Sequence, residues 1–392
     1  MKQSKKVLLF KGQSQYDVLR FFIDDLDQAF QSLGLSTVVI DLLARDAVSN
    51  LQRALNENQF LFALGFNGVG QDFRIQDRSL YDVFRIPYFA FFVDHPVYQD
   101  ARLRYSFQYQ IASFVDRDHL DFVNTYYPGK YAVFIPHGGC ADPVSRSNPI
   151  PLEKRSIPIL FAGSYQDPDT YLKSLDIPPD IMDQVHSISE IMLAGDSVNI
   201  HQATVSFYRT YGIEPDSDFI PIMRIADLYF RLVRRKELIL SLSELPLIIC
   251  GNGWDQLKGV KKPLTVLPAK SFDETLQLMG DSKISLSIVP SFRQGAHERV
   301  FSAMLSGTVA AADRNAYLDQ VLSPCVHYIG YRSTDPLADM LASALEDSDG
   351  LQAIASKGKK QAETNHAWLN RAVEIIRAVK DFLQRMQGTQ QG

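Results

Sequence analysis

The stretch KISLSIVPSFRQGAHERVFSAMLSGTVAAAD, from Lys283 to Asp313, organises the second half of the chain. Its first apolar run, residues 284–289, contains β-branched residues and predicts a strand that Pro290 ends. After a loop, apolar residues at helical spacing predict a helix that ends at Gly307. Residues 308–312 are apolar again and predict a second buried strand. The stretch is therefore a strand–loop–helix–strand unit.

The start of the predicted helix suits a ligand that carries a diphosphate. The free N–H groups near Gly295 and His297 lie at the positive end of the helix dipole and attract phosphate oxygens. Arg299 adds a fixed positive charge, and Glu298 can accept hydrogen bonds from sugar or ribose hydroxyls. The structural alternative is that Glu298 only favours the helix start, while Arg299 pairs with a surface acid.

The string G-x-H-E-R-V-F-x-A-M-x-x-G-x-x-x-x-x-D, from Gly295 to Asp313, resembles a known donor-site signature. It is the signature of the CgeB-like (spore maturation protein) branch of group-1 glycosyltransferases. The flanking order is similar to these proteins as well, with FAGS at 161–164, Arg235 in a helical segment and CGNGW at 250–254. The resemblance covers roughly residues 155–330 and is only architectural before them.

The resemblance implies the GT-B fold, in which two Rossmann-like domains face a cleft and the second domain holds a nucleotide-sugar. It implies that the base binds after the strand at 264–267, at Lys270, Ser271 and Phe272. Many relatives have a Glu at the position of Ser302, where it is expected to hold the ribose. Because Ser302 is too short for this, either Glu298 takes the ribose or donor affinity is reduced.

Composition places the chain among ordinary globular proteins. Its 392 residues are too many for one core and suit two domains. Apolar residues make up 46% and charged residues 22%, and the net charge of −5 excludes a basic bias. Nucleic acid is therefore not expected as a main partner.

Three widely spaced cysteines, Cys140, Cys250 and Cys325, form neither a disulfide framework nor a zinc motif. We expect inert thiols in a reducing compartment. The apolar run after MKQSKK is too short for a signal peptide, and no run approaches the roughly 18 apolar residues of a membrane span. A cytoplasmic location is expected.

The first half alternates strands and helices. The strands read as continuous apolar runs, which indicates an α/β domain whose parallel sheet is covered on both faces. We expect this domain at 1–142, a proline-rich linker at 143–158 and a second domain at 159–365. A long helix from Ala367 to Arg385 is expected to cross back to the first domain, followed by a disordered tail. The predicted strands are 7–10, 37–42, 60–64, 88–93, 111–115 and 131–135, then 159–162, 245–250, 264–267 and 326–329 beside the two above.

Ligands of parallel sheets bind beyond the carboxyl ends of the strands. In the first domain this rule selects the loops with Gly12 and Gln13, with Asn67 and Gly68, with Asp94 and His95, and with His137. We expect the first two loops on the acceptor side. The loop at 65–70 is not the dinucleotide fingerprint, so a nicotinamide site is not expected.

Asp94 and His95 are the candidate acid–base pair of this half, because an imidazole beside a carboxylate can take a proton from an acceptor hydroxyl. His137 is a further candidate for this role. The structural alternatives are that His95 binds a backbone carbonyl beside Pro96 and that His137 is a linker residue.

In the second domain, the candidate donor-side positions besides the helix start are Gly163, Asn252, Gly253, Trp254 and Ser291. Gly163 permits close approach of backbone to a ligand. Residues 170–245 are expected to be a helical insertion, and its cluster Arg231, Arg234, Arg235 and Lys236 is typical of a solvated helix face. The functional alternative is that one of these arginines reaches the diphosphate.

The sequence thus predicts a glycosyltransferase that moves a sugar from a UDP-, GDP- or dTDP-sugar to a hydroxyl of a glycan, protein or small molecule. No metal-ligand cluster is present in a suitable loop, so Arg299, the adjacent N–H groups and Lys283 are expected to meet the charge of the leaving diphosphate. Retention of configuration is what the resemblance implies. Two alternatives remain open: a sugar-nucleotide epimerase or hydrolase, and a non-catalytic sugar- or partner-binding protein.

Overall fold

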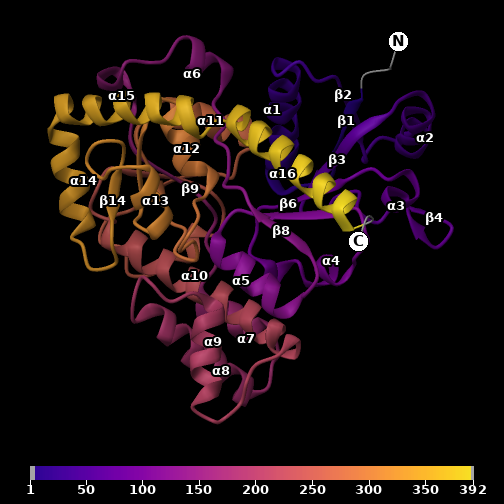
Figure 1. Ribbon diagram of the computed structural model, residues 1–392. Helices are drawn as coiled ribbons and strands as arrows, with labels where there is room; N and C mark the ends of the chain where they lie inside the picture. Colours follow the sequence, from indigo (N-terminus) through magenta and orange to yellow (C-terminus); the bar gives the residue numbers. More distant parts are fainter. Residues whose placement is uncertain (1–4, 390–392) are drawn as a thin grey trace. The chain divides into compact units, whose positions relative to one another are not determined.

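The structure is a computed structural model that describes residues 5–389, except the side chain of residue 389. It divides into two compact units, one formed by residues 1–138 with 367–392 and the other by residues 139–366. The chain therefore passes between the units twice, after Gly138 and after His366. Each unit contains its own six-stranded parallel sheet (Figure 1).

The sheet of the first unit has the order β2-β1-β3-β6-β7-β8. Its central strands are apolar runs, with Tyr88–Phe92 buried throughout and Phe60–Phe66 buried except at Leu61, as expected for a parallel sheet covered on both faces. All six predicted strands of this half are confirmed, with ends that move by at most two residues. They are β1 Lys6–Lys11, β2 Thr37–Asp41, β3 Phe60–Phe66, β6 Tyr88–Phe92, β7 Gln110–Phe114 and β8 Tyr131–Phe134.

Helices and one small hairpin connect these strands. The helices are α1 Val18–Ser32, α2 Ala47–Glu57, α3 Leu80–Phe84, α4 Asp100–Arg104 and α5 Arg117–Tyr126, and the hairpin strands are β4 Arg74–Ile75 and β5 Arg78–Ser79.

The C-terminal helix α16, Trp368–Thr389, packs in the first unit against α1. Its Trp368 is 2% exposed and its ring lies 4.9 Å from that of Phe22 and 5.5 Å from that of Phe66. Gly138 touches the same indole, since a Cβ at this position would lie 2.6 Å from the ring. The predicted disordered tail is wrong up to residue 389, which is helical because α16 continues, and residues 390–392 lie outside the described part.

The sheet of the second unit has the order β11-β10-β9-β12-β13-β14. The strand order reverses between β9 and β12, so the topological switch point lies at the ends of these two strands. The strands are β9 Ile157–Ala162, β10 Leu247–Cys250, β11 Thr265–Leu267, β12 Ser282–Ser287, β13 Val309–Asp313 and β14 Ile329–Tyr331.

The predicted helical insertion lies between β9 and β10. Figure 1 shows α7, α8 and α9 gathered around the long helix α10, and all three contact it. These helices are α7 Pro168–Ser174, α8 Pro179–Leu193, α9 Ile200–Arg209 and α10 Ile220–Ser241. The remaining helices of the unit are α6 Pro143–Ser147, α11 Phe272–Gly280, α12 Glu298–Leu305, α13 Ala316–Val321, α14 Leu337–Glu346 and α15 Ser348–Asn365.

Residues 143–158, predicted as the linker, lie inside the second unit. The reason is Arg155, which is only 6% exposed although the sequence around it is polar. Its guanidinium donates to the carbonyl of Ser282 (2.8 Å), the hydroxyl of Thr308 and the carbonyl of Ser306. These bonds connect the segment to the start of β12 and to the residues that precede β13.

Several elements differ from the expected ones: the short helices α3, α4 and α6 and the β4–β5 hairpin were not predicted. The last strand runs from Ile329 rather than from Val326, because Cys325 adopts a left-handed conformation and a turn precedes the strand. The helix α15 has no counterpart among the predicted elements. In residues 5–389 no helix is long and apolar enough to cross a membrane.

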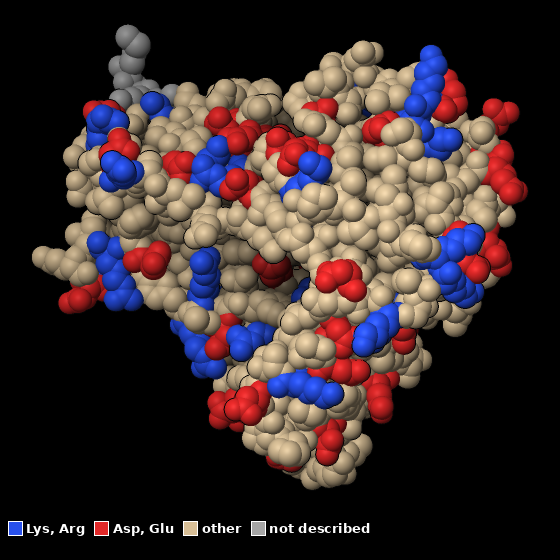
Figure 2. Space-filling view, turned by 180° about the vertical axis from the view of Figure 1, so that it is seen from behind, with Lys and Arg blue, Asp and Glu red and all other residues tan. Residues whose placement is uncertain are grey.

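The surface carries both signs of charge. On the face drawn in Figure 2, basic and acidic side chains are interspersed, and neither sign covers a large continuous area. This distribution agrees with the modest net charge of −5.

Candidate functional site

The carboxyl ends of the second sheet bring several predicted donor-side residues together. Gly163 follows β9, Gly251 to Gly253 follow β10, and the loop with Ser291 follows β12. These three strands are neighbours in the order β10-β9-β12, so their loops meet beside the switch point.

The loops after β9 and β10 pack directly on each other. The N–H of Gly163 donates to the carbonyl of Cys250 (2.9 Å), and the N–H of Asn252 donates to the hydroxyl of Ser164 (3.2 Å). A Cβ on Gly251 would lie 2.2 Å from the carbonyl oxygen of Gly163, so only glycine fits there. The two loops therefore form one fixed backbone surface.

Trp254 supports this surface and also lines a pocket beside Asn252. It is 4% exposed, stacks on Tyr165 with ring centroids 5.1 Å apart, and donates its Nε1–H to the carbonyl of Gly163 (2.8 Å). It therefore positions Gly163 and forms part of the wall of that pocket.

One face of α10 carries charged residues four apart, at Asp227, Arg231 and Arg235. Asp227 is 1% exposed, accepts a hydrogen bond from the hydroxyl of Ser291 (2.8 Å) and pairs with Nε of Arg231 (3.4 Å). The insertion helix thus connects to the loop after β12 at one end of this face and reaches the β9 loop at the other.

Arg235 reaches the β9 loop. Its Nη1 donates to the carbonyl of Ser164 (2.6 Å), and its guanidinium lies over the ring of Phe161, 5.8 Å from the centroid. Its Nε is buried and has no hydrogen-bond partner among the described residues. Burial, followed by the positive charges of Arg299 and Arg231, lowers the pKa of Arg235 to about 10. Arg235 is thus a buried cation with one unsatisfied donor, which suits contact with an anion.

The loop between β12 and α12 is held from two sides. Asn315 donates its Nδ2 hydrogens to the carbonyls of Phe292 (3.1 Å) and Gly295 (2.9 Å), and Arg293 donates to the carbonyl of Val198 (3.2 Å). The loop therefore has a fixed shape, and Gly295 within it is buried.

At the start of α12, His297 is the N-cap residue, and its Nδ1 accepts the N–H of Arg299 (3.4 Å). Glu298 is the first residue of the helix and is 4% exposed. Its carboxylate contacts Nδ1 of His297 and lies 3.9 Å from Nε of Arg299. His297 and Arg299 keep about a quarter of their side-chain surface exposed, 24% and 26%. A ligand can therefore reach these two side chains more easily than Glu298.

Ser302 lies one turn further along α12 and is fully buried. Its hydroxyl accepts the N–H of Cys140 (3.0 Å). Ser302 therefore fixes the backbone at Cys140, where the chain has just entered the second unit. Its buried hydroxyl cannot contact a ribose unless the surrounding side chains repack.

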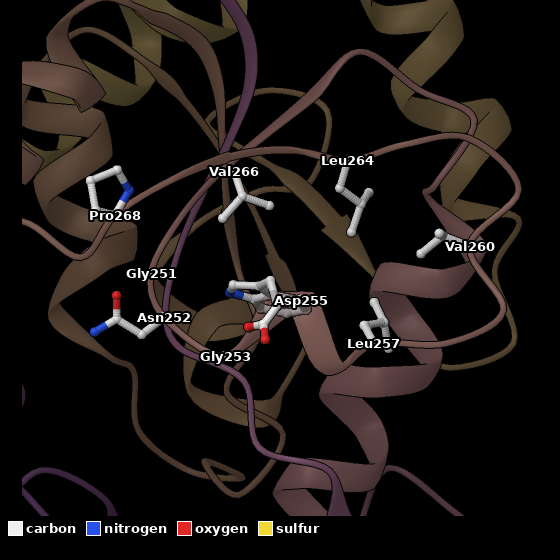
Figure 3. A pocket seen from close by; sticks show the side chains of 10 residues that line it. Gly251, Asn252, Gly253, Asp255, Leu257, Val260, Leu264, Val266 and Pro268 are labelled. Atoms are coloured by element: carbon white, nitrogen blue, oxygen red, sulfur yellow. The ribbon is translucent and has the colours of Figure 1, made fainter.

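A pocket of about 410 Å³ opens beside Asn252 (Figure 3). It exists because the connection from β10 to β11 contains only a short 3-10 turn, Trp254–Gln256, and no covering helix. Val266 and Leu264 lie opposite Leu257 in it (Figure 3). Asn252 and Asp255 supply its amide and carboxylate groups. Apolar walls with a few polar groups suit a flat organic ring.

The segment predicted to hold the base has its side chains engaged locally. Ser271 and Glu274 form a capping box at the start of α11, and Lys270 pairs with Glu274 (2.8 Å). Phe272 is 5% exposed. Any contact of this segment with a base therefore has to come from its backbone, next to Pro268 at the pocket rim.

In the first unit, the predicted acceptor-side residues follow β1, β3 and β6 at the carboxyl edge. The amide of Asn67 donates to the carboxylate of exposed Asp94 (2.8 Å) and accepts the N–H of Val93 (3.0 Å). Gln13 is exposed, and Gly68 has a positive φ of 73°. Gly12 packs closely against Val69. Asn67 and Asp94 are thus brought together.

The two candidate histidines of the first unit, His95 and His137, differ in their contacts. Nδ1 of His95 accepts the N–H of Val97 (3.2 Å), so the proton of its neutral imidazole lies on Nε2. Its ring lies 4.6 Å from that of His119. His137 is 2% exposed and packs against Phe22.

Lys283, expected near the diphosphate, is the second residue of β12. It lies four positions before the carboxyl end at Ser287, a distance of about 13 Å along the strand. It therefore lies at the opposite side of the sheet from the candidate site. Within residues 5–389, no group of three or more His, Cys, Asp or Glu side chains is arranged to hold a metal ion.

Arg235 was predicted only in part: it is one of the residues that carry the resemblance, and a diphosphate contact by one arginine of its cluster was the alternative to a solvated helix face. The spacing of Asp227, Arg231 and Arg235 by four residues is visible in the sequence. Such spacing is common on solvated helices, and only the burial of Asp227 in the structure identifies this face as an inner one.

Comparison with known proteins agrees with this architecture. Residues 234–377, less than half of the chain, match the family model described as "Glycosyl transferase-like". No curated protein matches the sequence.

Three solved structures share the fold at low sequence identity. Sucrose-phosphate synthase from Thermosynechococcus elongatus is 10% identical, with a TM-score of 0.53, over 97% of this chain and 100% of that one. HepE from Anabaena, in complex with UDP-glucose, is 12% identical, with a TM-score of 0.52, over 97% and 100%. An α-glucosyltransferase in complex with UDP and DNA is 10% identical, with a TM-score of 0.54, over 96% and 100%. The predicted α/β fold of GT-B glycosyltransferases is confirmed, and the family match and the fold together support a glycosyltransferase.

Proposed function

We propose that this chain transfers a sugar from a nucleoside-diphosphate sugar to a hydroxyl acceptor, as a member of the CgeB-like branch of group-1 glycosyltransferases. The observation that carries the proposal is the buried guanidinium of Arg235 against the β9 loop at the switch point of the second sheet, whose Nη1 donates to Ser164 while its Nε has no hydrogen-bond partner among the described residues. A diphosphate is an anion that supplies an acceptor for this Nε.

In this proposal Arg235 and Arg299 stabilise the charge that develops on the departing diphosphate. Glu298 accepts hydrogen bonds from the sugar or ribose, and the N–H groups between Gly295 and His297 contribute through the helix dipole. The proposed reaction needs no metal ion, retains the anomeric configuration and uses no cofactor besides the donor.

The pocket beside Asn252 is proposed to hold the nucleobase. Asn252 donates to Ser164, and Ser164 accepts from Arg235, so this pocket and the arginines share one loop. The HepE structure contains UDP-glucose, and UDP-, GDP- and dTDP-sugars are all candidates for this chain.

On the acceptor side, the proposal assigns proton transfer to Asp94 and His95, at the carboxyl edge of the first sheet. Asn67 orients the Asp94 carboxylate. We give His137 no direct role, because its ring packs against Phe22 in the core of the first unit. A glycan, a protein or a small molecule is the proposed acceptor, and the cytoplasm is the proposed location.

A panel of UDP-, GDP-, dTDP- and CMP-sugars in a thermal-shift assay tests the proposal. A ligand at 100 times its Kd stabilises the folded state by about 2.7 kcal/mol, which such an assay detects. Release of nucleotide that depends on an added acceptor identifies a transferase. Conversion of the sugar nucleotide without an acceptor identifies an epimerase or hydrolase instead, and the absence of any shift favours a non-catalytic protein.

A further inference from the structure

A second pocket, in the first unit, lies at the amino ends of β7 and β8 and has a volume of about 500 Å³. Gln110 is the first residue of β7, and Lys130 directly precedes β8. The helix α16 contributes Phe382, Arg385 and Met386. The candidate acceptor-side residues lie at the carboxyl ends of the same sheet, so this pocket is a separate site.

The pocket contains a lysine, Lys130, that donates to two neutral oxygen acceptors. Nζ of Lys130 donates to the carbonyl of Tyr105 (2.8 Å) and to Oε1 of Gln110 (2.9 Å). The amide of Gln110 is oriented in turn, because its Nε2 donates to Oε1 of Gln71 (3.3 Å). Gln110 and Gln71 are 6% and 4% exposed. This buried polar chain fixes the ammonium group and adds no negative charge to it.

Aromatic side chains form the walls. Phe107, Tyr131 and Phe382 line the pocket, and the rings of Tyr131 and Phe382 lie 5.2 Å apart, edge to face. Arg385 lies over the ring of Tyr131, 5.3 Å from its centroid. The residues that line the pocket include no Asp or Glu. The site therefore combines flat apolar surfaces with two cations.

We propose that this pocket binds a small planar aromatic carboxylate, whose carboxylate pairs with Lys130 and whose ring packs among Phe107, Tyr131 and Phe382. A neutral ring leaves the ammonium without a counter-ion, and a small aliphatic acid leaves the aromatic walls unfilled. This site is distinct from the proposed acceptor side, since it lies at the amino ends of the strands.

Calorimetry on the full chain at pH 7, with 2-naphthoate, 2-naphthamide and acetate, tests the proposal. We expect 2-naphthoate to bind at least about tenfold more tightly than the isosteric neutral amide, and acetate to show no binding. Equal affinity for acid and amide, or no binding of 2-naphthoate at millimolar concentration, overturns the proposal without recourse to any variant.

The variant Lys130→Met should lose the preference for the acid over the amide. Lys380→Met, on the exposed side of α16, is the matched control and should keep the preference. Thermal melting of both variants verifies that they fold. A Lys130→Met protein that folds and still prefers 2-naphthoate contradicts the role of Lys130.

Discussion

The guanidinium of Arg235 donates a 2.6 Å hydrogen bond to the main-chain carbonyl of Ser164. The bond joins the insertion helix α10 to the loop after β9, and it holds Arg235 close to Arg299. A group that is positively charged, buried at Nε and fixed in place is prepared to bind an anion without reorganising. The predictions about donor binding follow from this arrangement.

Arg235→Gln should weaken binding of the nucleoside diphosphate by roughly 10- to 100-fold. Loss of a hydrogen bond to a charged group costs about 1.5–3 kcal/mol, and inorganic pyrophosphate should lose affinity as well, because the contact is to phosphate. Calorimetric titration measures both. Arg224→Gln, at an exposed position of the same helix, should bind like the wild type. Unchanged affinity in folded Arg235→Gln would show that the diphosphate binds elsewhere.

Glu298→Ala should lower the rate of sugar transfer by at least about tenfold, since a charge-assisted hydrogen bond to the donor is lost. The measurement is the initial rate of nucleotide release with the donor and acceptor found by the panel. Asp349→Ala, which removes an exposed acid from the first turn of α15, controls for helix-dipole effects. Full activity of a folded Glu298→Ala protein would refute the assigned role.

Val266→Trp should block the base but not the phosphates. Val266 is 42% exposed and lines the pocket beside Asn252, so the indole can fill the pocket without disturbing the core. We expect at least about tenfold weaker binding of the nucleoside diphosphate with unchanged binding of pyrophosphate. Val326→Trp, at another exposed valine, should change neither. If Val266→Trp leaves nucleotide affinity intact, the base lies outside this pocket.

The stability of the protein should rise with pH in a way that depends on Lys130. Burial lowers the pKa of Lys130 from 10.5 to about 8 in the folded state. Between these values the unfolded chain binds more protons than the folded one, so the free energy of unfolding increases with pH. Because solvent screens this partly exposed group, the gain stays well below the roughly 3.4 kcal/mol that about 2.5 pKa units at about 1.36 kcal/mol each would give.

Urea unfolding at pH 7.5 and pH 10, compared between wild type and Lys130→Met, isolates this contribution because other titrating groups are shared. The wild type should gain more stability over this interval than the variant. An equal change in both proteins would mean that Lys130 titrates normally.

Much of the fold could be predicted from the sequence, because the strands of a parallel sheet are continuous apolar runs that end at glycine, proline or polar residues. The helix α12 illustrates this, since Gly307 adopts the positive φ of 67° expected after a helix end. Other elements depend on tertiary contacts and could not be predicted from the sequence pattern. The polar helix α15 buries only small residues and Leu351, and its Gly358 lies close to the carbonyl of His327, a contact that no sequence period indicates.

For the candidate site, too, one part could be predicted from the sequence and another depends on tertiary contacts. The loops after the strands could be located from the sequence, since their positions follow from the strand ends. Which side chains in them are accessible could not be predicted. Trp254 supports Gly163 through a hydrogen bond, and Glu298 is mostly buried between its neighbours. Arg235 contacts Ser164 from the insertion helix, although it lies 71 residues later in the sequence.

A crystal structure of the full chain with the nucleoside diphosphate selected by the donor panel tests the central proposal most directly. We expect the phosphate oxygens within hydrogen-bond distance of Arg235 and Arg299, next to Ser164, and the base in the pocket beside Asn252. A nucleotide bound away from both arginines would contradict the proposed donor site.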